Sequence, residues 1–183
     1  MRDYVIAIII IVLLIVAIIV IKKNKQNQIE GLGKIASKNR PPKLRIVYSK
    51  KQNIKDRKKV TSSGEVYKVL QEIWSKQIDA REEMIMLLLD RSNHVLGYHV
   101  LSMGGITGTV ADLRLLFAVA LKSLATSVIL THNHPSGSLT PSQADITLTK
   151  KIKEAGKIMD IQLLDHLIMT KTEYYSFADE GVL

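Results

Sequence analysis

The sequence predicts a mixed α/β domain that follows a single transmembrane helix. The first observation is an uncharged apolar run from Val5 to Ile21, which is close to the length of a membrane-spanning helix. The second is an alternation, further along the chain, between short apolar segments of strand length and segments with apolar residues at helical spacing. We therefore predict a transmembrane anchor at 1–22, a basic linker at 23–42 and one domain at 43–183.

The apolar run is expected to cross a membrane as a helix. Its 17 residues would span about 25 Å, against about 30 Å for the hydrocarbon core of a bilayer. A cleaved signal peptide is the alternative, but Lys22 and Lys23 follow the run in place of a small-residue cleavage site. The excess of cations after the run favours a single-pass membrane protein whose C-terminal domain lies in the cytoplasm.

The net charge of +9 belongs to one segment of the chain. Residues 22–60 hold fourteen Lys and Arg against two Asp and Glu, whereas residues 61–183 hold eleven against fourteen. The basic segment is expected to lie near anionic lipid headgroups. A nucleic-acid partner is an open alternative, but Tyr48 is the only aromatic residue of the segment and the charge of the domain does not support one.

The first expected elements of the domain are an edge strand and a helix. Residues 43–48 alternate polar and apolar side chains and carry the cations that protect an edge strand. Ser62 and Glu65 form a capping-box pattern. This pattern predicts the start of a helix over 63–75, in which apolar residues recur at helical spacing.

A β-hairpin is predicted next. Residues 84–89 form an apolar run of strand length, residues 90–93 are turn formers, and residues 94–101 form a second strand. Three glycines between positions 104 and 108 then indicate a loop.

The second half of the domain alternates helices and strands. A mostly apolar helix is expected over 112–125, followed by a short buried strand over 127–131. A second helix over 143–158 and a strand over 161–169 come next. The tail after residue 173 is expected to be irregular.

A metal site is predicted where the buried strand ends and the next helix begins. The chain has no cysteine, so imidazoles and carboxylates are its strong ligands. Side chains alternate along a strand, so His132 and His134 face one side with Cα atoms roughly 6.5–7 Å apart. Asp145 falls in the first turn of the helix and can supply an oxygen. Two His and one carboxylate, with a fourth position left for water, form a catalytic zinc arrangement.

Simpler roles exist for the same residues. A His pair at a strand end can be a hydrogen-bonded polar pair, and Ser142 with Asp145 forms an S-x-x-D helix cap. Capping and metal binding do not exclude each other, because the first turn of a helix also holds its side chains in fixed positions.

Taken together, these motifs resemble a known family. H-x-H-P at 132–135, followed by six residues and S-x-x-D at 142–145, resembles the JAMM (MPN-plus) metalloprotease signature. The run His-Asn-His-Pro-Ser-Gly at 132–137 resembles the RadC branch, and Asn133 favours that branch because deubiquitinating relatives carry Ser or Thr there. The resemblance covers about 60–183. Three further segments resemble RadC: 104–110, 163–168 and 174–181.

The resemblance implies a fold and the roles of further residues. JAMM and cytidine-deaminase-like domains have a central mixed β-sheet flanked by helices. In JAMM enzymes a glutamate upstream of the zinc motif is the general base. The matching residue here is Glu82, with Glu83 as the fallback, since only one of two neighbouring strand residues can face the site. Ser142 would donate a hydrogen bond to the oxyanion.

The implied function is that of a membrane-anchored zinc metallopeptidase. Such a hydrolase cuts a peptide or isopeptide bond of a protein or peptide substrate with a Zn²⁺-activated water and a glutamate base. One alternative is a DNA-repair-associated or nucleic-acid-binding protein without peptidase activity, because the RadC family has carried a DNA-repair label. The other is a non-catalytic binding module.

The remaining histidines have simpler interpretations. His94 and His99 fall in the predicted hairpin and are expected to be ordinary sheet or surface residues. His166 lies in one of the segments that resemble RadC, where it either supports a metal ligand or is purely structural.

Overall fold

The computed structural model of the protein describes residues 18–23, 25, 53–104 and 111–183. The chain divides into two units, Met1–Arg45 and Ile46–Leu183. Within the first unit, residues 18–23 are helical. All elements described below belong to the second unit.

The expected membrane location is contradicted. Among the described residues, no helix combines the length and the apolar character that crossing a bilayer requires. The expectation of a single-pass membrane protein is therefore wrong. Most of the apolar run lies outside the described residues, as do the expected edge strand at 43–48 and the boundary between linker and domain, which stays a prediction.

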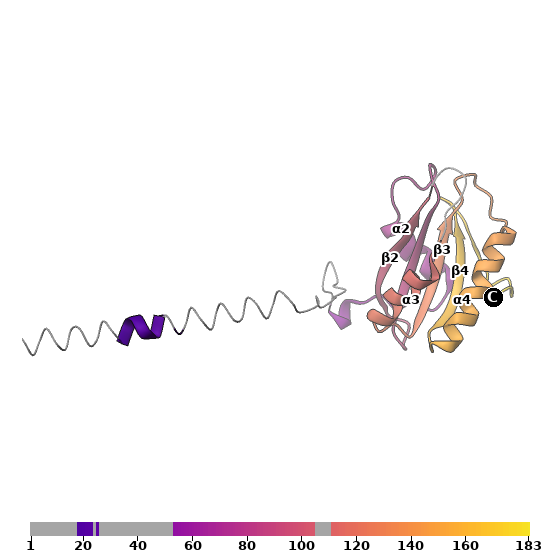
Figure 1. The fold of residues 1–183 in the computed structure, drawn as a ribbon. Helices are drawn as coiled ribbons and strands as arrows, with labels where there is room; N and C mark the ends of the chain where they lie inside the picture. Colours follow the sequence, from indigo (N-terminus) through magenta and orange to yellow (C-terminus); the bar gives the residue numbers. More distant parts are fainter. Residues whose placement is uncertain (1–17, 24, 26–52, 105–110) are drawn as a thin grey trace, which may run out of the picture. The chain divides into compact units, whose positions relative to one another are not determined.

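The second unit is a mixed α/β fold, as the sequence predicts. Five strands form one sheet in the order β2-β1-β3-β4-β5, and helices flank it (Figure 1). In chain order the elements are the 3-10 turn η1 (Ile54–Asp56), α2 (Ser63–Ile73), β1 (Glu83–Leu89), β2 (Val95–Met103), α3 (Leu113–Lys122), β3 (Ser127–Asn133), α4 (Gln143–Ile158), β4 (Gln162–Met169) and β5 (Tyr174–Ser176).

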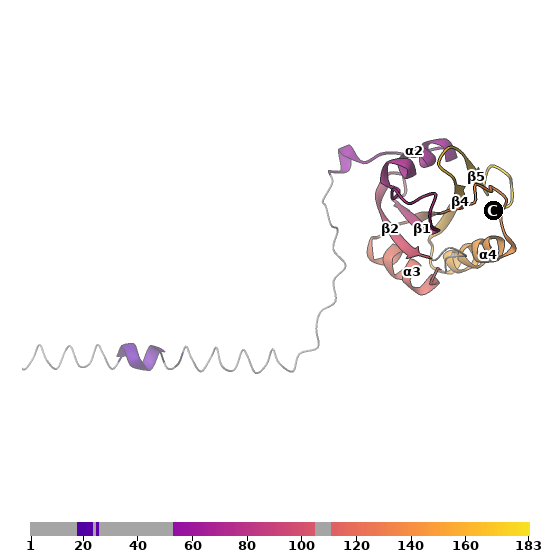
Figure 2. The same ribbon diagram turned by 90° about the horizontal axis from the view of Figure 1, so that it is seen from above.

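The sheet is mixed, and its centre is the strand that carries the histidine pair. β3 pairs antiparallel with β1 and parallel with β4, while the outer pairs β1–β2 and β4–β5 are antiparallel. The parallel pair β3–β4 requires a crossover, and α4 provides it. The view from above shows α3 and α4 on one face of the sheet and α2 on the other (Figure 2).

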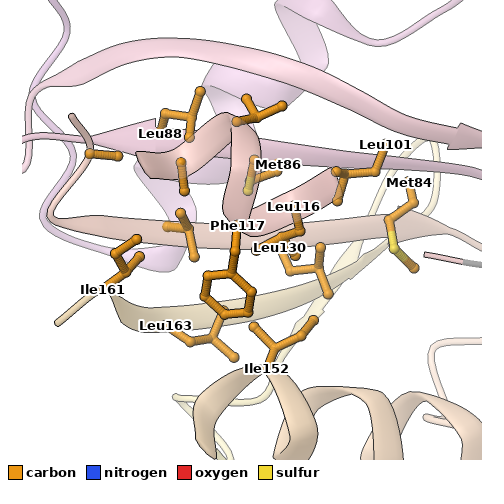
Figure 3. Packing of buried hydrophobic residues seen from close by; sticks show 14 residues of the cluster. Met84, Met86, Leu88, Leu101, Leu116, Phe117, Leu130, Ile152, Ile161 and Leu163 are labelled. Carbon is orange, nitrogen blue, oxygen red and sulfur yellow. The ribbon is translucent and has the colours of Figure 1, made fainter. Parts of the chain in front are cut away.

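Each face of the sheet has its own apolar core, and these two faces organise the site. On the face covered by α3 and α4, here called the α3/α4 face, Phe117 packs between the sheet residue Leu130 and Ile152 of α4 (Figure 3). On the opposite face, here called the α2 face, Leu70 of α2 packs against strand residues such as Leu87. Because side chains alternate along a strand, each strand residue belongs to one of the two faces.

Most element boundaries follow the sequence prediction, with two differences. The tail after residue 173 is irregular only from residue 177 onward, because β5 pairs with β4 from Leu167↔Ser176 to Met169↔Tyr174. Three residues are too few to produce a recognisable alternation. The helix expected over 112–125 ends at Lys122, because Leu124 adopts the left-handed conformation with φ of 57°. The expected glycine loop lies largely outside the described residues.

Candidate metal centre

The two histidines of the predicted site lie at the carboxyl end of β3. His132 pairs with Met84 of β1, and Met84 belongs to the α3/α4 core. His132 therefore faces the same side, and His134 lies two residues further on. His132 is 2% exposed, whereas the His134 side chain is half-buried. The strand thus brings one deeply buried and one accessible imidazole to the same face.

Asp145 joins this pair from the first turn of α4. Its Oδ2 accepts hydrogen bonds from the backbone N–H of Ser142 at 2.7 Å and from the Ser142 hydroxyl at 2.6 Å. Its own N–H donates back to Ser142 Oγ at 3.1 Å, which completes a capping box. The other oxygen, Oδ1, lies 3.3 Å from His132 Nε2. Oδ2 therefore caps the helix while Oδ1 faces His132, so capping and metal binding are compatible roles for Asp145.

The spacing of these three side chains fits a metal ion. His132 Nε2 lies 3.0 Å from His134 Nε2, and His134 Nε2 lies 3.9 Å from Asp145 Oδ2. One ligand atom from each residue falls within 4.8 Å of the others. Tetrahedral bonds of about 2.0–2.1 Å to zinc place neighbouring ligand atoms about 3.4 Å apart. The separations observed bracket that value.

Hydrogen bonds fix which nitrogen of His134 is free. Its Nδ1 lies 2.7 Å from the carbonyl oxygen of Ser138. A carbonyl oxygen only accepts, so Nδ1 carries the hydrogen and donates it. In the neutral imidazole, Nε2 then presents a lone pair toward the site.

A series of hydrogen bonds through Thr149 and His166 fixes the tautomer of His132. Thr149 donates its hydroxyl hydrogen to the Asp145 carbonyl at 2.6 Å, so its oxygen accepts from His166 Nδ1 at 2.6 Å. His166 Nε2 then carries a lone pair and accepts from His132 Nδ1 at 2.9 Å. Burial lowers the pKa of His132 to about 4 and the pKa of His166 well below its usual value, so both rings are neutral near pH 7.

The hydrogen bonds of His132 and His134 leave one lone pair on each ring, and these two lone pairs face each other. The Nε2 atoms of His132 and His134 are 3.0 Å apart, and when both rings are neutral neither carries the hydrogen that would make this contact a hydrogen bond. Two lone pairs at this distance repel unless a cation lies between them, and the Asp145 carboxylate beside them adds a negative charge. The donor set and its protonation state therefore fit a divalent metal ion with imidazole and carboxylate ligands.

Ser142, the predicted oxyanion donor, lies at the edge of this site. Its hydroxyl accepts from the Asp145 N–H and donates to Asp145 Oδ2. To donate to an oxyanion, the hydroxyl has to rotate away from Asp145. The backbone N–H of Ser142 still donates to Oδ2 at 2.7 Å, so the cap does not depend on the hydroxyl alone.

The two candidate glutamates fall on opposite faces of the sheet. Glu83, 2% exposed, accepts hydrogen bonds from Ser75 Oγ at 2.8 Å and Arg81 Nε at 3.1 Å. It alternates with Met84 and therefore faces the α2 side, away from the histidines. Glu82 directly precedes β1, and its carbonyl accepts from Gly104 N–H at 2.9 Å, which extends the pairing with β2. Strand alternation then places Glu82 on the α3/α4 face, which favours Glu82 over Glu83 as the candidate general base.

Two residues at this site were not anticipated, and the role of a third was open. Thr149 lies one helical turn after Asp145, and this i, i+4 spacing was a usable signal. Asn133 entered only as a family marker, although its side chain makes three hydrogen bonds. His166 contacts a predicted ligand directly. His94 contacts Asp90 Oδ1 at 3.3 Å, and His99 pairs with Met86 inside the hairpin, so both lie in the predicted elements.

The chain belongs to the RadC family. A family model described as a RadC-like JAB domain matches residues 60–182, which contain all of the candidate site. JAB domains form a hydrolase superfamily, and the His132, His134 and Asp145 cluster agrees with the metal dependence of that superfamily.

The chain is also similar to curated proteins from several bacteria. It is 52% identical over 125 residues to a UPF0758 protein of Flavobacterium johnsoniae. It is 39% identical over 133 residues to one of Porphyromonas gingivalis, and 38% identical over 141 residues to one of Chlorobium chlorochromatii. These matches cover 68%, 72% and 76% of this chain but 54%, 58% and 60% of the relatives. The chain thus spans little more than half the length of the curated relatives it matches.

Replacing His166 by phenylalanine is expected to weaken metal binding about 10–100-fold, because the His132 ring loses the acceptor that fixes its tautomer. Phenylalanine retains a ring that can stack on Phe177, whose centroid lies 4.7 Å from that of His166. The measurement is competition with a chromophoric chelator at pH 7. Phe177→Leu is the control, because it alters packing on the same ring without touching the hydrogen bonds. A His166→Phe affinity within twofold of the wild-type value would contradict this role.

Proposed function

We propose that this protein is a zinc-dependent hydrolase of JAMM type that cleaves a peptide or isopeptide bond. The observation that carries the proposal is the convergence of two imidazole nitrogens and one carboxylate oxygen. His132 Nε2 lies 3.0 Å from His134 Nε2 and 3.3 Å from Asp145 Oδ1. Imidazole and carboxylate ligands suit zinc. The five-stranded mixed sheet with helices on both faces agrees with a JAMM and cytidine-deaminase-like fold.

The proposed chemistry divides among five side chains and a metal. His132, His134 and Asp145 would hold the ion. Three protein ligands leave a position for water or substrate, which distinguishes a catalytic from a structural zinc site. When bound, zinc lowers the pKa of water from about 15.7 toward about 7 and so supplies a nucleophile at neutral pH.

The remaining steps are proton transfers and charge stabilisation by the chain itself. Glu82 accepts a proton from the attacking water while the water oxygen bonds to the carbonyl carbon. The C–N bond then breaks, and Glu82 returns the proton to the leaving amine. Ser142, once its hydroxyl turns from Asp145, donates a hydrogen bond to the oxyanion, an interaction worth about 10²–10³ in rate.

The test combines metal analysis with a cleavage profile of the full chain. We expect one equivalent of zinc by plasma mass spectrometry and cleavage within a library of peptides and isopeptide-linked peptides. Removing the metal with a chelator should abolish cleavage, and adding zinc back should restore it, because the attacking water depends on the ion. Purified protein that binds no metal, or that cleaves equally well without it, would rule the proposal out.

A further inference from the structure

The side chain of Asn133 is buried on the face of the sheet opposite the two histidines. It lies on β3 between the two histidines, but alternation directs it to the opposite, α2 face of the sheet. It is fully buried, with 0% exposure. Its Oδ1 accepts from the backbone N–H of Glu83 at 2.7 Å, and its Nδ2 donates to the backbone carbonyls of Ile78 at 2.6 Å and Arg81 at 2.9 Å.

Two of these three hydrogen bonds hold the two peptide groups that flank Glu82. The Arg81 carbonyl belongs to the peptide group before Glu82, and the Glu83 N–H belongs to the peptide group after it. Asn133 binds both, at sequence separations of 52 and 50 residues. The Glu82 carbonyl is held separately by Gly104 N–H. The backbone of Glu82 is thereby fixed on each side.

The sheet itself does not provide this link. The pairing of β1 with β3 starts at Met84↔His132, so the residues before Met84 have no ladder partner on β3. Beyond the end of this ladder, the Asn133 side chain provides the hydrogen bonds between the two segments. A side-chain amide suits this task because it combines one acceptor with two donor hydrogens. Serine and threonine each offer a single donor hydrogen, and aspartate offers none when ionised.

We propose that Asn133 is a positioning residue that sets the distance between Glu82 and the metal ligands. This inference rests on the proposed function, in which Glu82 is the general base. The ligands His132 and His134 are the direct chain neighbours of Asn133, so one residue ties the strand that carries the metal ligands to the segment that carries the base. A displacement of about 1 Å between reacting groups can lower a rate about 10²-fold.

The test uses Asn133→Ala and Asn133→Ser in the full chain. We expect kcat to fall about 10–100-fold with KM within about twofold, because substrate and metal binding do not depend on the Glu82 segment. Zinc affinity should stay within about threefold of the wild-type value. Exchange of the Glu83 amide hydrogen, followed by NMR, should become about tenfold faster once its acceptor is gone. Asn133→Ser decides the matter if the alanine variant does not fold.

Thr131→Val is the matched control. Thr131 lies on the same strand and faces the same side, is 0% exposed, and its hydroxyl has no hydrogen-bond partner among the described residues. Its replacement should leave kcat and the exchange of the Glu83 amide unchanged. A second control places Asn133→Ser in a Glu82→Gln background. If Asn133 acts through Glu82, the added loss of kcat there is below about twofold.

The outcomes separate this inference from the proposed function. An Asn133→Ser variant with faster Glu83 exchange and wild-type kcat, in a protein that Glu82→Gln inactivates, would overturn the positioning role and leave the function intact. A wild-type protein without hydrolytic activity would overturn the function. In that case the exchange of the Glu83 amide hydrogen still reports whether Asn133 holds the segment. Unchanged exchange in both Asn133 variants would overturn that link as well.

Discussion

We expect Glu82→Gln to lower the kcat of the proposed hydrolysis by about 10²–10⁴-fold, while the metal content stays at the wild-type level. The expected size follows from the contribution of a general acid–base group to catalysis. Glutamine has nearly the same shape but cannot accept the proton of the attacking water. Glu82 precedes β1 on the face of the sheet that carries the histidines, and it is not among the described metal ligands. The measurements are steady-state cleavage kinetics and metal analysis of the same preparation.

Glu83→Gln is the matched comparison. Glu83 accepts from Ser75 and forms an ion pair with Arg81 at 3.1 Å, so its neutralisation should reduce the free energy of unfolding by about 1–3 kcal/mol. Its effect on kcat should be much smaller than that of Glu82→Gln. If Glu83→Gln loses activity and Glu82→Gln does not, the two residues exchange roles and the argument from strand alternation is wrong.

We expect His134→Ala to abolish the proposed metal binding and, with it, the proposed hydrolysis. Two ligands would remain, so the loss of affinity should exceed the about 10–100-fold effect expected from altering a partner of a ligand. The His134 side chain is 14% exposed, and its removal leaves space open to solvent rather than a cavity in the core. The fold should therefore persist in the metal-free variant. Circular dichroism, metal analysis and cleavage assays on one preparation measure all three consequences.

His99→Ala is the control for His134→Ala. His99 lies on β2 opposite Met86, outside the cluster that His132, His134 and Asp145 form. Its removal should leave both metal content and cleavage unchanged. A His134→Ala variant that keeps one equivalent of metal at wild-type affinity would show that the ion binds elsewhere, and the proposed site would have to be abandoned.

Much of the fold was predictable because its signals are local. The apolar run of β1, the strand β3 and the long helix α4 agree closely with the sequence prediction. The cap at Ser142 is also present. These features depend on residues within one or two helical turns or on the two-residue alternation of a strand. The expected membrane location rested on the apolar run and on the cations that follow it, and the structure contradicts it.

The elements that were missed depend on distant partners. β5 has three residues, and it forms a strand only because β4 offers it an edge from Leu167 to Met169. The contact of His166 with His132 joins residues 34 apart in sequence, and the hydrogen bonds of Asn133 reach across 50 to 55 residues. Neither periodicity nor motif spacing contains information on such pairs.

The sequence by itself determined which residue types can bind a metal here and that two of them share a face. In a chain without cysteine, His132, His134 and Asp145 follow from strand alternation and from a helix cap. The tertiary structure decided what those residues can do together. Hydrogen bonds to His166 of β4 and to the Ser138 carbonyl direct the lone pairs of the two imidazoles at one point. The register of β1 against β3 separates Glu82 from Glu83, because pairing between distant strands assigns each side chain to a face.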